Sequence, residues 1–180
     1  CAGQKPPRLI KKDMGGFNGF EVGPDGMLYG PLWFKGQVVT IDPADGRMAV
    51  IADGFQVPAA ANLDGKGNLW VVDARSGELV RVELASGRKT VARQLRPSLD
   101  NLAIASDGTI YVSNMANNEI QAFDPATGAL RTLTSGKVAV PAGMKIDGND
   151  LWVADVFGFR RVDVRTGEVQ DVFRMQRDPE

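Results

Sequence analysis

The chain has 180 residues, a formal net charge of −1, 43% hydrophobic residues and 24% charged residues, which is the composition of an ordinary globular domain. It contains no histidine, so Ser-His-Asp triads, Cys-His pairs and His-ligated zinc are excluded from this chain. Basic residues gather only in isolated pairs and no apolar run is long enough to span a bilayer, so we expect neither a nucleic-acid partner nor a membrane span.

One short phrase recurs along the whole chain at intervals of 41 residues. The phrase has four residues: a glycine or asparagine, one variable residue, a leucine or isoleucine, and an aromatic residue. The aromatic residues are Tyr29, Trp70, Tyr111 and Trp152. Repeats of this length that are built from strands are typical of β-propeller blades. A sandwich of two stacked sheets has the same rhythm of turns, but it does not explain the self-similarity.

Taken in order, residues 1–17 are expected to be the tail of a preceding blade, and 18–58, 59–99, 100–140 and 141–180 are expected to be one blade each. First strands are predicted near 20–22, 61–63, 102–104 and 144–146, and each second strand ends in the aromatic phrase. Third strands are predicted at 38–41, 79–82, 120–123 and 160–164, and fourth strands at 47–51, 88–91, 129–133 and 168–172. The glycine and aspartate residues that lie between these strands are predicted to form tight turns. The prediction is an all-β propeller of four-stranded antiparallel blades, with about four blades present.

Two alternatives account for a sequence that begins with Cys1. Cys1 is the only cysteine in the sequence, which excludes an internal disulfide, and no signal peptide is visible in the sequence. Either Cys1 is the lipid-carrying first residue of an exported lipoprotein, or the chain is a piece of a longer protein. Because 8–11 resembles the fourth-strand segment at Val50-Ile51, the second alternative is favoured. Open blade edges expose unpaired backbone, so self-association that completes a ring is also expected.

The innermost strand of each blade lines the channel of a propeller, which places Asn18, Asp100 and Asn101 at the channel mouth. Their oxygen atoms can hold a divalent cation such as Ca²⁺, which would polarise a carbonyl and activate water. The alternative is that these side chains cap the starts of strands. Glu21 and Lys145 lie within the channel-lining strands, where either can project into the channel or pair with a neighbour that this sequence does not include.

A second group of residues follows the second strands on the same face. Asn114 and Asp155 repeat at a fixed interval, so they either form turns or contact a ligand. Trp33, Phe34 and Phe157 occupy the next loop and either line an apolar pocket or pack between blades. These five residues are the predicted contacts for a small-molecule ligand.

Three phrases resemble those of the senescence-marker-protein/gluconolactonase propellers, which are related to strictosidine-synthase-like and NHL-type propellers. The phrases are Phe17-Asn18-Gly19 through Pro24-Asp25-Gly26, Leu99-Asp100-Asn101-Leu102, and Pro141-Ala142-Gly143-Met144-Lys145-Ile146-Asp147. The resemblance implies a six-bladed ring with a divalent cation on its axis, often Ca²⁺, and metal-assisted opening of lactones. It implies Asn18, Asp100 and Asn101 as cation ligands.

This chain departs from that family at the metal site. Ala142 replaces the aspartate that the resemblance implies as ligand and base, and the early glutamate phrase is absent. Asp100 is then the remaining candidate for the base. Three hypotheses follow: a lactone or ester hydrolase, a propeller that binds ligands or proteins without catalysis, and an assembly module.

Overall fold

The computed structural model describes residues 7–175, and over that range every regular element is a β-strand. The first blade contains β1 (Glu21–Val22), β2 (Leu28–Leu32), β3 (Gln37–Ile41) and β4 (Met48–Ala52). The second contains β5 (Pro58–Leu63), β6 (Asn68–Asp73), β7 (Glu78–Glu83) and β8 (Lys89–Gln94). The third contains β9 (Leu99–Ile104), β10 (Ile110–Asn114), β11 (Glu119–Phe123) and β12 (Leu130–Ser135). The fourth contains β13 (Met144–Asp147), β14 (Asp150–Asp155), β15 (Gly158–Asp163) and β16 (Val169–Arg174).

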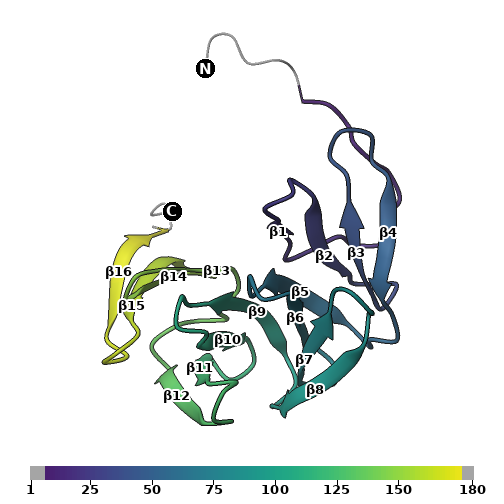
Figure 1. The fold of residues 1–180 in the computed structure, drawn as a ribbon. Coiled ribbons are helices and arrows are strands. Elements are labelled where there is room, and N and C mark those ends of the chain that lie inside the picture. Colours follow the sequence, from purple (N-terminus) through teal and green to yellow (C-terminus); the bar gives the residue numbers. More distant parts are fainter. Residues whose placement is uncertain (1–6, 176–180) are drawn as a thin grey trace.

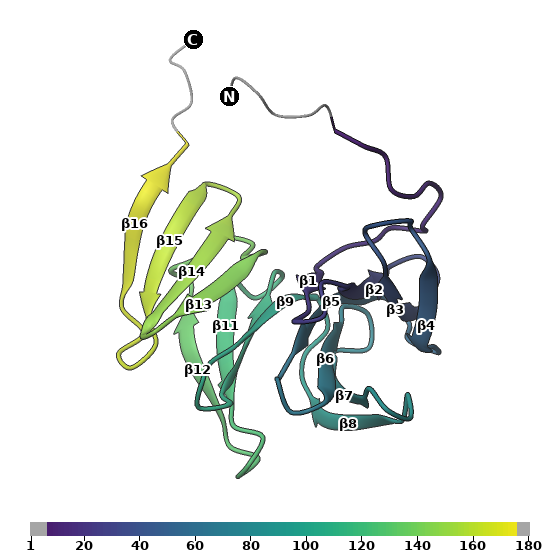
Figure 2. The ribbon, with the colours of Figure 1, turned by 45° about the horizontal axis from the view of Figure 1, so that its top comes forward.

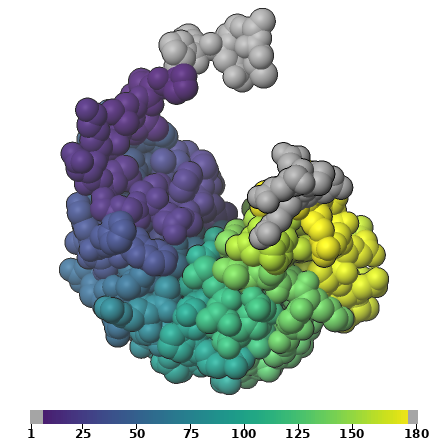
Figure 3. Space-filling view, turned by 180° about the vertical axis from the view of Figure 1, so that it is seen from behind, coloured from purple at the N-terminus to yellow at the C-terminus, as the bar shows by residue number. Residues whose placement is uncertain are grey.

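The four sheets are arranged around one centre. Each sheet is antiparallel, with its strands in sequence order, which confirms the predicted all-β class and the four-stranded blades. The first strands β1, β5, β9 and β13 lie innermost and the fourth strands lie outermost (Figure 1). A second view shows the blades as separate sheets that follow one another around the axis (Figure 2). The result is an arc that stays open between the first and fourth blades (Figure 3). No helix of the described residues is long and apolar enough to cross a membrane.

The blades hold together because side chains along a strand alternate between two neighbours. In β6, Leu69 and Val71 belong to an apolar cluster shared with the first blade, whereas Trp70 and Val72 belong to one shared with the third. The central strand is therefore buried on both faces, and nearly all of its side chains are inaccessible. The repeated aromatic residue packs toward the following blade in the first three blades, at Tyr29, Trp70 and Tyr111.

In the second, third and fourth blades, the second strand ends in an aspartate or asparagine whose side chain hydrogen-bonds to two segments of backbone. Asp73 is 1% exposed and accepts N–H groups from Val57, before its blade, and from Arg75, in the following turn. Asn114 is 2% exposed and donates to the Pro97 carbonyl oxygen at 2.9 Å. Buried polar groups need such partners. These hydrogen bonds fix the segment that enters each blade against the turn between its second and third strands.

Asp155 has the same place in the fourth blade and adds an ion pair. Its carboxylate accepts the N–H groups of Ala139 and Phe157 and lies 2.8 Å from Arg160 Nε. Arg160 also binds Asp171 on β16. Burial acts to raise the pKa of Asp155, but the hydrogen bonds from Arg160, Phe157 and Ala139 outweigh it and hold that pKa below 3.8. The ion pair therefore stabilises the charged form inside the blade.

The segment before the first blade lies where the repeat would place the fourth strand of a preceding blade. At Gly87, an added Cβ would lie 2.4 Å from the Ile51 carbonyl oxygen of β4. At Gly46, 41 residues earlier in the chain, it would lie 2.5 Å from the Ile10 carbonyl oxygen. The chain around Ile10 thus lies against the first blade as β4 lies against the second. Cys1, on which the lipoprotein alternative depends, is outside the described residues.

Gly87→Ala is expected to destabilise the fold more than Gly128→Ala. Both glycines have positive φ, +69° and +75°, so either alanine costs roughly 1–2 kcal/mol in backbone strain. Only Gly87 approaches another backbone, which adds on the order of 1–3 kcal/mol of overpacking. Denaturant unfolding of the two variants measures the difference, and equal free energies of unfolding would contradict the close approach between blades.

Arg160→Met is expected to lower the free energy of unfolding at neutral pH by about 3 kcal/mol, because it leaves a buried carboxylate without its cation. The Arg160 and Asp155 side chains are 4% and 0% exposed. A carboxyl group whose pKa is lower in the folded state than in the unfolded state stabilises the fold at pH values above its unfolded-state pKa. This contribution to the free energy of unfolding disappears as the pH falls through the folded-state pKa. The difference from the unsubstituted chain should therefore shrink below pH 3.8.

The control for this prediction is Arg161→Met, which removes an exposed pair with Asp150 at 3.6 Å. That variant should lose well under 1 kcal/mol, as is usual for surface pairs. An Arg160→Met variant that is as stable as this control at neutral pH would show that the buried pair does not stabilise the blade.

Candidate functional site

A cavity of about 420 Å³ lies on the axis where the innermost strands converge. Each blade contributes one polar side chain to its lining: Glu21 from β1, Asn62 from β5, Asn101 from β9 and Lys145 from β13. Apolar contributions come from Phe20, Val22 and Met144. The four polar residues are far apart in the sequence, and the radial arrangement of the blades brings them to one place.

The two charged groups of this axial cavity differ in their partners. Glu21 accepts the Leu63 N–H at 2.7 Å and the Asn62 amide at 3.4 Å, so its carboxylate is fixed by the second blade. Lys145 is exposed and forms no ion pair with any described residue. The ammonium group of Lys145 is therefore available to a ligand, whereas Glu21 is already partly satisfied.

A β-bulge in β9 places Asn101 in the cavity. The register of β9 with β10 shifts between Val112 and Asn114, opposite Asn101. Ser113 Oγ accepts the Asn101 N–H at 3.0 Å and lies 3.4 Å from the carbonyl oxygens of Asn101 and Ala142. Bulges of this kind change the direction of a side chain. The Ser113 hydroxyl thus replaces the backbone hydrogen bond that the bulge removes between β9 and β10. The side-chain amide of Asn101 lines the axial cavity.

The predicted cation ligands do not come together as a set. Asn101 lines the axial cavity, but Asn18 and Asp100 line none of the described cavities. Asn18 is exposed ahead of β1, where its N–H donates to the Pro31 carbonyl oxygen at 3.2 Å. Asp100 is half-buried, and burial raises its pKa above 3.8.

These residues do not fit a divalent cation. Ca²⁺ takes six to eight oxygen ligands. Among residues 7–175, no three Asp, Glu, Cys or His side chains gather closely enough to form a site. The axial cavity offers the Glu21 carboxylate, already hydrogen-bonded, and it also contains the ammonium group of Lys145, which repels a cation. The predicted cation stays a prediction that rests on the family resemblance.

The predicted ligand contacts on the second-to-third-strand loops lie outside the described cavities. Phe34 is 81% exposed and Phe157 is 53% exposed, whereas Trp33 packs against the apolar cluster of the second and third blades. Asn114 and Asp155 are buried and bonded to backbone groups. Their structural role in the turns is evident, and ligand contact by any of the five residues stays a prediction.

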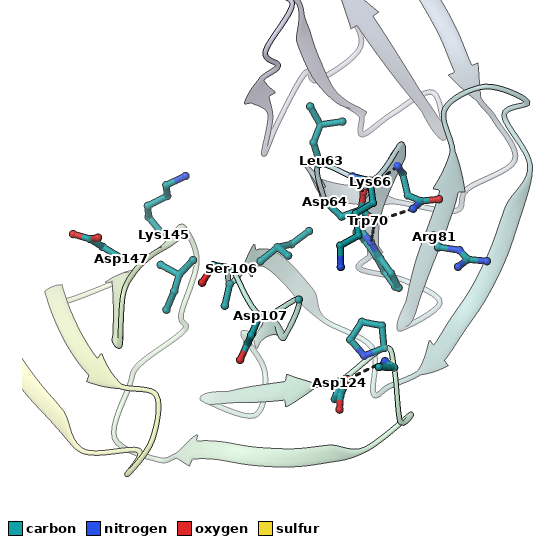
Figure 4. Close-up of a pocket in the computed structure, with 18 of the residues that line it drawn as sticks. Leu63, Asp64, Lys66, Trp70, Arg81, Ser106, Asp107, Asp124, Lys145 and Asp147 are labelled. Carbon is teal, nitrogen blue, oxygen red and sulfur yellow. Dashed lines mark hydrogen bonds between the residues drawn. The ribbon is translucent and has the colours of Figure 1, made fainter.

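Sequence reasoning missed two features of the site. Asn62 was not among the candidates, although its place 41 residues after Glu21 is a signal that could have identified it. A second cavity, of about 700 Å³, lies among the turns between first and second strands (Figure 4). Asp64 lies there, and it accepts N–H groups from Lys66 and Trp70. Its carboxylate is therefore committed to its own turn. Lys145 lines both cavities.

No protein-family model and no curated protein matches the sequence. Among solved structures, the chain is similar to a streptogramin B lyase, with a TM-score of 0.72, 16% identity, and coverage of 87% of this chain and 54% of that one. It is similar to a catalytically inactive virginiamycin B lyase from Staphylococcus aureus with quinupristin, with a TM-score of 0.73, 14% identity, and coverage of 94% and 59%. It is also similar to a chain of a nidogen/laminin complex, with a TM-score of 0.66, 10% identity, and coverage of 90% and 81%.

The chain therefore spans somewhat more than half the length of the two lyases. Identities this low establish the fold and nothing finer. The fold is that of a β-propeller, and it is shared by enzymes and by a protein found in a complex with another protein.

Proposed function

We propose that this chain is a ligand-binding propeller module whose axial cavity holds a small polar molecule that carries a carboxylate. The observation that supports the proposal is the convergence of Lys145 with the amides of Asn62 and Asn101 in one cavity. An ammonium group without an ion-pair partner attracts an anion, and the amide N–H groups orient it.

The rest of the lining narrows the ligand class. Glu21 would repel a second negative charge, but its carboxylate can accept hydrogen bonds from hydroxyl groups. Phe20 and Met144 can cover a short carbon skeleton. A monocarboxylic hydroxy acid satisfies all of these groups at once, and gluconate is a suitable probe.

Lys145→Met is expected to weaken gluconate binding at least tenfold, because charged hydrogen bonds contribute about 1.5–3 kcal/mol. Isothermal titration calorimetry measures the dissociation constants. Lys137→Met is the matched control, since Lys137 is exposed and lines none of the described cavities. Unchanged affinity in the Lys145 variant, or no binding by the original chain, would contradict the proposal.

A second candidate is hydrolysis of a lactone or ester, and the state of Asp100 favours it. Its pKa is raised by burial, and no described residue donates a hydrogen bond to its carboxylate. Such a carboxylate can accept a proton from an attacking water. The family resemblance points to the same reaction. Hydroxy acids are the products of lactone opening, so the same compounds probe both candidates.

We expect the chain to bind gluconate without opening gluconolactone faster than buffer does, in a pH-stat assay with and without Ca²⁺, Mn²⁺ or Zn²⁺. We also expect none of these metals to raise the midpoint of thermal unfolding, since specific binding would raise it by mass action. Turnover that rises with pH and falls about a hundredfold or more in Asp100→Asn would instead establish the hydrolase. Asp107→Asn, in an exposed turn, is the control.

A further inference from the structure

The repeated aromatic residue has a hydrogen-bond partner in the first two blades but not in the third. Tyr29 Oη donates to Asp25 Oδ2 at 2.8 Å, and Trp70 Nε1 donates to Asp64 Oδ2 at 3.1 Å. Tyr111, at the same position of the repeat, is 3% exposed, and its hydroxyl forms no hydrogen bond with any residue in the described part of the chain. Buried polar groups rarely lack a partner, so this hydroxyl is a candidate contact for a ligand.

Tyr111 lines a cavity of about 330 Å³ between the third and fourth blades, which we call the inter-blade cavity. Burial raises the pKa of Tyr111 above 10.0, and the charge of Asp107 acts in the same direction, so the hydroxyl keeps its proton at neutral pH. Asp107 lines the same cavity, and its carboxylate already accepts the Thr109 N–H at 2.8 Å. The Tyr111 hydroxyl is therefore a hydrogen-bond donor that the protein itself does not use.

The inter-blade cavity adjoins the cavity of about 700 Å³ among the turns, which we call the turn cavity (Figure 4). Asp107 and Asp124 belong to the linings of both, and we call the two cavities together the turn groove. Apolar clusters join the second blade to the third and the third to the fourth. The groove therefore lies along blades that are packed against one another inside the arc.

The turn cavity contains a guanidinium group that has lost the partner found elsewhere in the repeat. Arg81 lies opposite Trp70 in the second blade, and Arg161 holds the equivalent position in the fourth. Arg161 lies 3.6 Å from the carboxylate of Asp150, but Asn68 takes the place of Asp150 in the second blade. Arg81 is exposed and forms no ion pair with a described residue.

A second cation of the turn cavity also departs from the repeat. Lys66 stands where the first and third blades have Asp25 and Asp107, and it forms no ion pair with a described residue. A Cβ added at Gly108 would lie 3.9 Å from Lys66 Nζ, so the ammonium group extends toward the turn of the third blade. Lys66 and Arg81 are therefore both available to a ligand.

The charges around the turn groove indicate the class of that ligand. Lys66 and Arg81 from the second blade would repel a cation, and the carboxylates of Asp107 and Asp124 from the third blade would repel an anion. Hydroxyl groups accept hydrogen bonds from ammonium, guanidinium and phenol groups, and they donate hydrogen bonds to carboxylates. A neutral molecule with many hydroxyl groups satisfies both kinds of charge, and a short chain of sugar units has this chemistry.

We propose that the turn groove binds a neutral oligosaccharide, with Lys66 and Arg81 as donors in the turn cavity and Tyr111 as a donor in the inter-blade cavity. The turn cavity lies within the range of about 300–1,000 Å³ that is usual for small-molecule sites, and the inter-blade cavity extends it. The carboxylates of Asp107 and Asp124 are fixed by N–H groups of their own turns, so these acceptors are in place before a ligand binds. The proposal does not depend on the ligand of the axial cavity.

Isothermal titration calorimetry with maltotriose and cellotriose, two neutral trisaccharides with different linkages, tests the proposal. At least one of them should bind, and trimers of galacturonate and of glucosamine, which carry negative and positive charges, should bind more weakly. Tyr111→Phe should weaken binding of the neutral trisaccharide about three- to tenfold, because one neutral hydrogen bond is lost. The free energy of unfolding should not fall, since the hydroxyl has no partner among the described residues. Tyr29→Phe is the matched control, because Tyr29 lines none of the described cavities, and it should leave the affinity unchanged.

Arg81→Met should weaken trisaccharide binding about tenfold or more, because a charged hydrogen bond is lost. Its control is Arg93→Met, since Arg93 is exposed and lines none of the described cavities. Neither Tyr111→Phe nor Arg81→Met should alter gluconate binding, because neither residue lines the axial cavity, so the two sites are tested separately.

Three results would overturn the oligosaccharide site. The first is that neither neutral trisaccharide binds. The second is that a charged trimer binds more tightly than the neutral ones. The third is that a neutral trisaccharide binds the Tyr111→Phe and Arg81→Met chains as tightly as the original chain, which would place it outside the turn groove.

Discussion

The architecture depends on one requirement: each blade must bury both of its faces against other blades. Strand alternation makes this possible, because Leu69 and Val71 face backward while Trp70 and Val72 face forward. A blade of about forty residues cannot bury enough apolar surface alone, which is the general reason why such repeats are stable only when stacked. The stability of the arc therefore depends on the apolar interfaces between its blades.

The same requirement determines how the chain uses its charged groups. Asp73 and Asp155 lie at buried turns, where a carboxylate satisfies backbone N–H groups that no strand can satisfy. Asp64 holds an exposed turn in the same manner. Most acidic residues near the cavities thus serve the backbone. Lys145 forms no ion pair with a described residue, and the carboxylate of Asp100 receives no hydrogen bond from one, so these two charged groups are not committed to the backbone.

The axial cavity depends on how the blades are placed around the axis. It is lined by all four innermost strands, so its shape depends on how the first and fourth blades are held relative to each other. Lys145 pairs with Trp152 across β13 and β14, so the position of its ammonium group follows from the position of the fourth blade.

The sequence by itself determined the fold. Turn residues and aromatic residues at intervals of 41 define strands and blades locally, and the resulting four-stranded sheets were confirmed. It also indicated that Glu21 and Lys145 could reach the channel, because both lie on innermost strands. Local pattern could not decide which polar residues meet. That depends on the bulge in β9 beside Asn101 and on the packing of the innermost strands around one axis, which brings Glu21, Asn62, Asn101 and Lys145 together. These are properties of whole sheets packed against one another, and no short stretch of sequence specifies them.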